Sequence, residues 1–352
     1  MEVQTYSAFT MGALAVVVLA ALTLPFLIHK IEEELEVFLL VCGVAAVSIS
    51  GLWSGHLVAE GLKEPLTITA AVLVLGVLFK KFGAYLAHGI HWLEKKTGPR
   101  ILLFCTVLVL GLTSSIITAI VAALAAAEII KLLDLDERLK IKLTVYICFA
   151  VGLGAVLTPI GEPLSTIIVA KLKGAPYFAD FLFLLKLMGI WIVPGILLFA
   201  LLASRLGKGR QLTQPAQDNA RGETYKTILI RAGKVYLFVA ALIWLGEGLK
   251  PLAAQTITKL SKYALYWINS LSAVLDNATL ASIEIMPSLG KETLVFLTMS
   301  LILAGGLLIP GNIPNIICAS KLNIKSKEWA REALPVGIVL MVIYFLIMSL
   351  VL

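Results

Sequence analysis

Two acidic residues lie deep in apolar stretches of this sequence and are its strongest candidates for chemistry. Asp276 occurs in SAVLDNATLASIEIMP, and Glu162 occurs in LTPIGEPLST. A carboxylate in apolar surroundings is costly unless it binds a cation, a proton or a partner. Burial favours the protonated form, so a proton and a cation would compete for the same group. The pair predicts exchange of a proton for a metal ion, with Asp276 and Glu162 as metal ligands. The alternative for Asp276 is a protonated side chain that hydrogen-bonds between helices.

Neutral oxygen donors accompany both acids. The candidate ion-binding residues are Asn277 beside Asp276, Ser115 and Thr118 in SSIITAIVA, Thr158 and Ser165 around Glu162, and Asn312 and Asn315 in LIPGNIPN. Hard cations such as Na⁺ favour oxygen ligands. The sequence has no HExxH, GxSxG, Walker A or CxxC pattern, so we expect neither an enzyme nor a cofactor, only a transported cation and H⁺.

The composition requires a membrane around these residues. Of 352 residues, 59% are hydrophobic and 14% charged, and the apolar stretches are long and continuous. Such stretches predict an all-α polytopic membrane protein, since the strands of a membrane β-barrel would show alternating apolar and polar residues. The net charge of +7 then indicates loops that face the cytoplasm and anionic lipid, with no nucleic-acid partner.

The expected spans lead into two apolar stretches that we interpret as re-entrant hairpins. The spans are 8–28, 36–58, 66–81, 180–203, 226–249 and 333–352, and the hairpins are 100–132 and 265–288, each preceded by an amphipathic connector, 82–97 or 251–264. With both hairpins re-entrant, 21 of the 29 Lys and Arg lie on one face. By the positive-inside rule both termini lie outside. We expect the inner (plasma) membrane of a prokaryote.

An internal repeat sets the domain organisation. Segments 142–172 and 292–322 are interrupted by Pro and Gly, and GEPLSTIIVAKL (161–172) aligns without a gap with GNIPNIICASKL (311–322). We expect N-terminal helices at 1–65, a first repeat at 66–203, a cytoplasmic linker at 204–225 and a second, inverted repeat at 226–352. Broken helices in inverted repeats are typical of secondary transporters, because freed backbone groups can hold ions.

The segments S-A-V-L-D-N-A-T (272–279), T-P-I-G-E-P (158–163) and P-G-N-I-P-N (310–315) resemble an ion-transporter superfamily that includes NhaD-type sodium/proton antiporters, arsenite-efflux carriers and dicarboxylate carriers. The resemblance implies a scaffold that forms a homodimer and a mobile region with both hairpins and both broken helices. It implies ion ligands at the hairpin tips and at the breaks. The Asp-Asn pair is most similar to the antiporter and arsenite branches.

Three functions are compatible with these features. The first is a Na⁺/H⁺ antiporter that works by alternating access. The second is an anion or oxyanion carrier, although all seven Arg fall in or near loops, which predicts no buried fixed positive charge. The third is a membrane scaffold or assembly protein, which would carry no flux. Glu128 and Glu284 lie near hairpin ends, and we interpret them as structural or interfacial.

Overall fold

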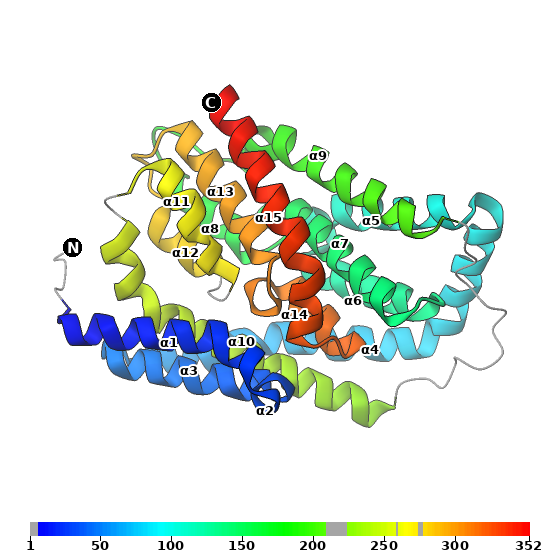
Figure 1. Ribbon diagram of the computed structural model, residues 1–352, viewed down its shortest axis with the longest axis horizontal. Helices are drawn as coiled ribbons and strands as arrows, with labels where there is room; N and C mark the ends of the chain where they lie inside the picture. Colours follow the sequence, from blue (N-terminus) through cyan, green and yellow to red (C-terminus); the bar gives the residue numbers. More distant parts are fainter. Residues whose placement is uncertain (1–5, 209–223, 258–259, 274–276) are drawn as a thin grey trace.

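The computed structural model describes residues 6–208, 224–257, 260–273 and 277–352 (Figure 1). Within these ranges the chain forms helices and connections and no strand, which confirms the predicted all-α class. In chain order the elements are α1 (Ala8–Leu27), α2 (His29–Glu33), α3 (Leu35–Ser50), α4 (Gly55–Thr97), α5 (Pro99–Ile117), α6 (Ala119–Leu132), α7 (Glu137–Ala155), α8 (Pro163–Lys171), α9 (Phe183–Leu206), α10 (Tyr225–Ile257), α11 (Lys262–Ile268), the 3₁₀-helix η1 (Asn269–Ala273), α12 (Asn277–Glu284), α13 (Lys291–Gly305), the 3₁₀-helix η2 (Ile309–Gly311), α14 (Ile313–Leu322) and α15 (Ser326–Val351).

Six of the described helices are long and apolar enough to cross a membrane. They are α1, the Gly55–Gly83 part of α4, α5, α9, the Tyr225–Leu252 part of α10, and α15. Large apolar side chains are exposed on several of them, including Phe9, Ile190 and Leu350, which are 85%, 77% and 86% exposed. Lipid, and not water, suits so apolar a surface. The chain is therefore an integral membrane protein.

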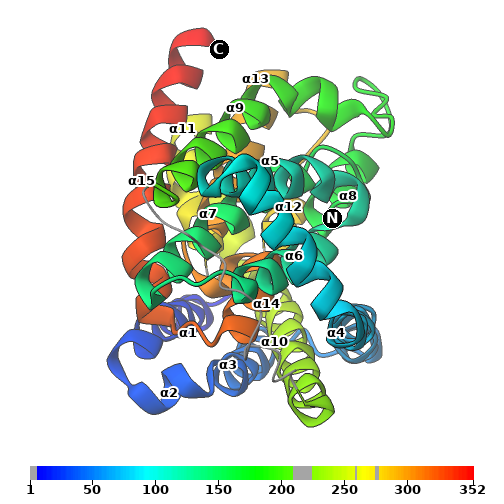
Figure 2. The ribbon, with the colours of Figure 1, turned by 90° about the vertical axis from the view of Figure 1, so that its right-hand side faces the viewer.

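The N-terminal helices form a layer with α10, below the rest of the molecule in Figures 1 and 2. Within it, α3 and α10 approach so closely that their backbones touch. A β carbon on Gly248 would lie 2.5 Å from the nitrogen of Val47, and one on Gly43 would lie 2.9 Å from the carbonyl oxygen of Ala241. Glycine permits such close approach because it has no side chain, and membrane helices commonly associate in this way.

Several predicted boundaries in this layer are wrong. The span expected at 36–58 ends at Ser50, because Gly51 takes a positive φ of 69° and stops the helix. The span at 66–81 and the connector at 82–97 are one helix of 43 residues, α4, whose charged second half lowers hydropathy without breaking the helix. The connector at 251–264 is divided as well, since α10 continues through Pro251 to Ile257 and α11 begins at Lys262.

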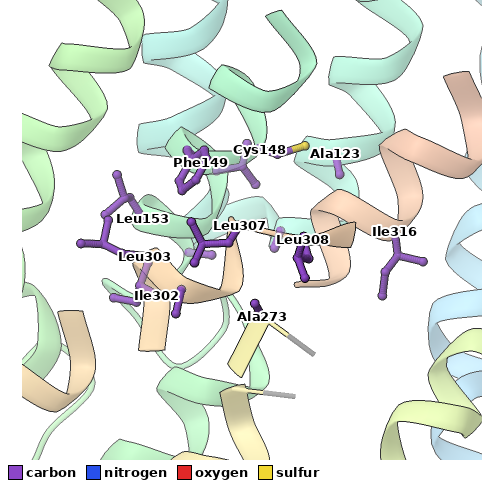
Figure 3. Close-up of a cluster of buried hydrophobic side chains, with 14 of the residues drawn as sticks. Ala123, Cys148, Phe149, Leu153, Ala273, Ile302, Leu303, Leu307, Leu308 and Ile316 are labelled. Atoms are coloured by element: carbon purple, nitrogen blue, oxygen red, sulfur yellow. The ribbon is translucent and has the colours of Figure 1, made fainter. Parts of the chain in front are cut away.

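Both predicted interruptions occur in the described chain. α7 ends at Ala155 and α8 begins at Pro163, while α13 ends at Gly305 and α14 begins at Ile313. The interrupted helices meet in the apolar core. Figure 3 shows Phe149 and Leu153 of α7 in one buried cluster with Leu303 and Leu307 from the second interrupted helix. The core therefore holds the two breaks near one another.

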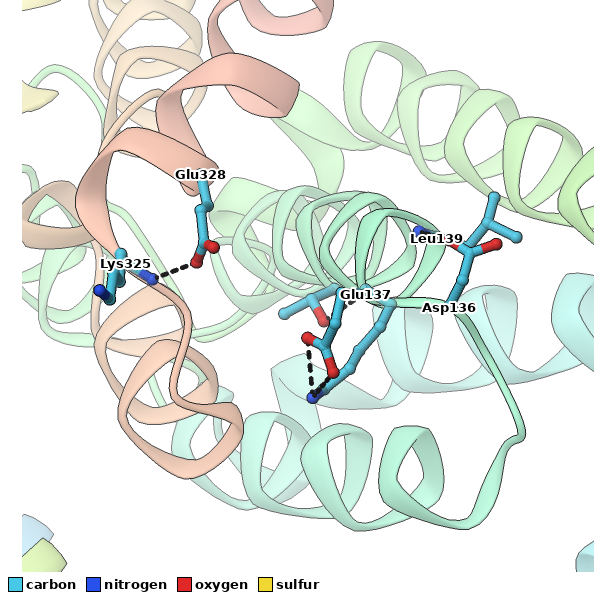
Figure 4. A network of polar contacts seen from close by, with 7 residues as sticks. Asp136, Glu137, Leu139, Lys325 and Glu328 are labelled. Carbon is cyan, nitrogen blue, oxygen red and sulfur yellow. Dashed lines mark hydrogen bonds and ion pairs between the residues drawn. The ribbon is translucent and has the colours of Figure 1, made fainter.

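Two helices that lead into this core begin at one end of the molecule. The carboxylate of Asp136 accepts a hydrogen bond from the amide of Leu139 at the start of α7, and that of Glu328 accepts one from the amide of Lys325 at the start of α15, both at 2.9 Å (Figure 4). An ion pair of 3.1 Å joins Arg138 to Glu332. Because this pair joins the start of α7 to the first turns of α15, the two helices begin at the same end of the molecule.

The close contact of α3 with α10 can be tested by adding one methyl group. Gly248→Ala should lower the free energy of unfolding by about 1–3 kcal/mol, because the new methyl overlaps the backbone of α3. Gly233→Ala is the matched control on the same helix, where a β carbon would meet nothing within 4 Å. Thermal unfolding of the purified protein in detergent measures both. Equal stability of the two variants would contradict the contact.

Candidate functional site

Two side chains, the buried Ser165 and the exposed Thr166, satisfy backbone carbonyls at the first interruption. The hydroxyl of Ser165 donates to the carbonyl oxygens of Thr158 and Glu162, each at 2.7 Å. The hydroxyl of Thr166 donates to the carbonyl of Pro159 at 2.6 Å. Pro159 and Pro163 have no N–H to continue a helix ladder. The sequence thus breaks the helix and supplies the donors that the break requires.

The second interruption repeats this arrangement at equivalent positions. Asn315, which aligns with Ser165, donates through Nδ2 to the carbonyls of Gly305 and Leu308, both at 2.9 Å. Leu308 is the equivalent of Thr158, whose carbonyl Ser165 holds. The two aligned glycines also make the same contact. A β carbon on Gly161 would lie 1.9 Å from the carbonyl oxygen six residues earlier, and one on Gly311 would lie 2.5 Å from its counterpart. The two breaks are therefore locally alike in geometry as well as in sequence.

The turn between α5 and α6 rests on the first interruption. Thr118, the one residue between these helices, has φ 72° and ψ 151°, a region where β-branched residues are rare. The amide of Ala119 donates to the carbonyl of Gly161 at 2.9 Å, and the Thr158 hydroxyl donates to the carbonyl of Ser115. These bonds gather Ser115, Thr118, Thr158 and the backbone around Glu162 in one place.

The end of η1 and the start of α12 lie beside the second interruption, as the turn between α5 and α6 lies beside the first. A β carbon on Gly311 would lie 3.0 Å from Cα of Ala273, and one on Gly305 would lie 3.2 Å from Nδ2 of Asn277. Asn312 faces α7, because its Nδ2 would be 2.7 Å from a β carbon on Gly152. Asn277, Asn312 and Asn315 are thus gathered at the second break. Asp276 lies outside the described residues.

The described part of the site offers one buried acid among neutral donors. Glu162 is only 7% exposed and occupies the N-cap position of α8. A negative charge is favourable at a helix N-terminus because of the helix dipole. No three His, Cys, Asp or Glu side chains in the described ranges gather closely enough to hold a metal ion. The donor set consists of amide, hydroxyl and carbonyl oxygens with a carboxylate, which suits a hard cation of low charge.

Two lysines at equivalent positions connect the halves, and sequence reasoning missed their role. Lys321 at the end of α14 forms an ion pair with Glu128 of α6. Lys171 at the end of α8 donates to the carbonyls of Ser282 in α12 and of Ile285 just beyond it. Each broken helix therefore holds the outgoing helix of the hairpin in the other half. The signal was present in the aligned segments, which both end in Lys-Leu.

The expectation that no fixed positive charge is buried is wrong. Arg231 is 6% and Lys321 3% exposed. Arg231 lies six residues after the first residue of α10, near a helix end as expected, but its side chain is buried. Both interact electrostatically with Glu128, as does Lys131. Lys131 and Lys321 lie near the C-terminal ends of α6 and α14, which begin at the breaks, and Arg231 of α10 interacts with the same Glu128. These cations therefore do not add positive charge at the gathered oxygen donors.

Comparison with known proteins identifies a family whose function is not known. The family model described as "Protein of unknown function (DUF1646)" matches residues 11–351. A search among curated proteins finds no match.

The donors at the breaks can be tested through stability. Ser165→Ala should lower the free energy of unfolding by about 1–3 kcal/mol, because two buried carbonyls lose their donor. Ser204→Ala is the control, since that hydroxyl also donates to a carbonyl, at 2.8 Å, but on an exposed helix surface. Its effect should stay within about 0.5 kcal/mol. Thermal unfolding decides, and a loss of the same size for both variants would refute the role of Ser165.

The contact between Lys321 and Glu128 can be tested by a double-mutant cycle. Glu128→Gln leaves Lys321 buried beside Arg231 and Lys131 without an acid, which should cost about 3–5 kcal/mol of stability. Adding Lys321→Met should restore most of that loss. Glu137→Gln, which removes an exposed partner of Lys140, should cost less than about 1 kcal/mol. Additive losses in the double variant would show that the two groups do not interact.

Proposed function

We propose that this chain, which belongs to the DUF1646 family, is a secondary active transporter that exchanges Na⁺ for protons by alternating access. The observation that carries the proposal is the pair of helix interruptions, each satisfied by a buried polar side chain and each contacted by a neighbouring turn or helix start. Non-helical backbone at membrane depth survives only where protein or a water-lined cavity surrounds it. Transporters use such breaks to hold ions.

The donors at the two breaks support a cation as the transported species. Glu162 contributes a carboxylate at the first break, and Asp276 directly precedes Asn277 at the second. Thr158, Thr118 and Asn312 add neutral oxygens. A cation bound here would replace the proton that a buried carboxyl otherwise needs, so the two ions would bind in turn. In this proposal Ser165 and Asn315 keep the breaks in shape, since their donors are used by backbone carbonyls.

The arrangement of the membrane protein follows from the same proposal. The layer of α1, α3, α4 and α10 would act as the scaffold and dimer interface, and the body with the breaks would move. The termini would lie outside the plasma membrane of a prokaryotic cell, with the end that holds Arg138, Glu332 and Lys321 in the cytoplasm. The recurrence of equivalent contacts at the two breaks supports two repeats of inverted topology.

An anion or oxyanion carrier is the second candidate. The N-termini of α8 and α14 both begin at the breaks, and helix N-termini attract anions. Against it, the N-cap residue of α8 is the acidic Glu162, and the buried cations lie away from the breaks. We therefore favour the cation exchanger.

Ion flux tests the proposal directly. Purified protein in liposomes that contain a pH-sensitive dye should move protons when Na⁺ is added outside, and Asp276→Asn and Glu162→Gln should abolish this movement because each removes a charge that would bind the cation. Glu137→Gln is the matched control, because that side chain is 79% exposed at the start of α7 and should leave the flux unchanged.

The same liposomes distinguish the alternatives. Li⁺ and K⁺ in place of Na⁺ define the selectivity, and arsenite or a dicarboxylate tests the anion carrier. Proton movement that does not depend on any cation, or full activity of both acid variants, would overturn the antiporter. Absence of flux for every ion in the wild-type protein would favour the scaffold or assembly protein.

A further inference from the structure

A second buried polar cluster joins η1, α12 and α13, away from the hydrogen bonds of the two breaks. Asn269 donates through Nδ2 to Oε2 of Glu284 and to Oγ of Ser300, both at 2.9 Å. The Ser300 hydroxyl in turn donates to the carbonyl of Leu297 at 2.9 Å. All three side chains are excluded from the surface, with Asn269 and Glu284 1% and Ser300 0% exposed. The sequence led us to interpret Glu284 as structural or interfacial, and the structure places its side chain inside the protein.

Two oxygen atoms in this cluster accept no hydrogen bond from the described residues. Oε1 of Glu284 and Oδ1 of Asn269 have no hydrogen-bond partner among the residues that the structure describes. Both atoms are acceptors, and the two side chains are already joined by one hydrogen bond. An ionised carboxylate with a single neutral donor in such a place is strongly disfavoured. A proton on Oε1 removes the charge and makes this oxygen a donor, for which Oδ1 of Asn269 is the available acceptor.

The charged groups on the neighbouring elements leave this carboxyl unpaired within the described ranges. The elements that contact α12 are η1, α8, α10 and α13. The charged residues of these elements are Lys171 on α8, Lys291 and Glu292 on α13 and, in the second half of α10, Glu247 and Lys250. Lys171 donates to the carbonyls of Ser282 and Ile285, Lys250 pairs with Glu247, and Glu292 pairs with Lys262.

We propose that Glu284 is a proton-binding site of this protein, in which one carboxyl oxygen binds H⁺ and the resulting O–H group donates a hydrogen bond to Oδ1 of Asn269. The step is the formation of one O–H bond on binding and its loss on release, with no other reactant. Asn269 precedes and Glu284 follows Asp276 in the sequence. The proton would therefore link η1 to α12, the two elements on either side of Asp276. As a second proton site of an exchanger, Glu284 rests on the proposed function, but its protonation can be measured without transport.

Infrared spectroscopy of the purified protein at neutral pH tests the protonation. The wild-type protein should show the carbonyl stretch of a protonated carboxyl group, and Glu284→Gln should lose this band. Glu137→Gln should retain it, because that exposed carboxylate is ionised. Asn269→Ala should keep the band but shift it to higher frequency, since the carboxyl loses its acceptor. This second variant keeps the test valid if Glu284→Gln fails to fold.

Identical carboxyl bands in the wild type and in Glu284→Gln, or an unshifted band in Asn269→Ala, would overturn the proton site. Sodium-driven proton flux in the same preparations separates this result from the proposed function. A band assigned to Glu284 in a protein without cation-driven flux would retain the proton site and refute the exchanger. Cation-driven flux in a wild-type protein that shows no band assignable to Glu284 would retain the exchanger and refute the site.

Discussion

The satisfaction of backbone carbonyls inside the membrane is the constraint on which the rest of this structure depends. A helix that stops at Ala155 or at Gly305 leaves carbonyl oxygens that lipid cannot solvate, and each such group costs several kcal/mol. At each break one buried side chain, Ser165 or Asn315 at the same aligned position, donates to two backbone carbonyls. These residues were predicted as ion ligands, and their observed hydrogen bonds give them first a supporting role.

Sequence patterns could predict the breaks because their causes are local. Each break has two prolines four residues apart with a glycine between them, Pro159 and Pro163 or Pro310 and Pro314, whereas a single proline such as Pro251 lies inside a continuous helix. Helix ends without such a signal were not predictable from hydropathy. α3 stops at Gly51 within a still apolar run, and α4 continues through charged residues, because hydropathy measures the preference for lipid and not the propensity for helix. The contacts of Lys321 with Glu128 and of Asn269 with Glu284 depend on packing between distant segments, which one sequence does not specify.

The two halves are held together by contacts that cross between them. Each half places its turn or helix start on its own break, as Ala119 does with Gly161. Each broken helix also ends in a lysine that holds the outgoing hairpin helix of the other half. The α5–α6 pair and α12 each therefore contact both the break in their own half and the broken helix of the other half. Movement of either alone would break a contact of each kind, so we expect these helices and the breaks to behave as one body.

Small residues make this arrangement possible at the centre of that body. A β carbon on Gly154 would lie 1.7 Å from the carbonyl oxygen of Gly111, and one on Gly306 would lie 2.2 Å from the ring of Phe149. The Ser114 hydroxyl, which also contacts this region, donates to the carbonyl of Val151 at 3.0 Å. Backbone therefore lies against backbone where α5 and α7 cross, and the ring of Phe149 lies directly against the backbone of the second break. In the proposed exchanger, a cation at the breaks would meet backbone carbonyls together with the Thr158 hydroxyl and the side-chain amides of Asn277 and Asn312. Such a site would distinguish cations by the number and spacing of its oxygens.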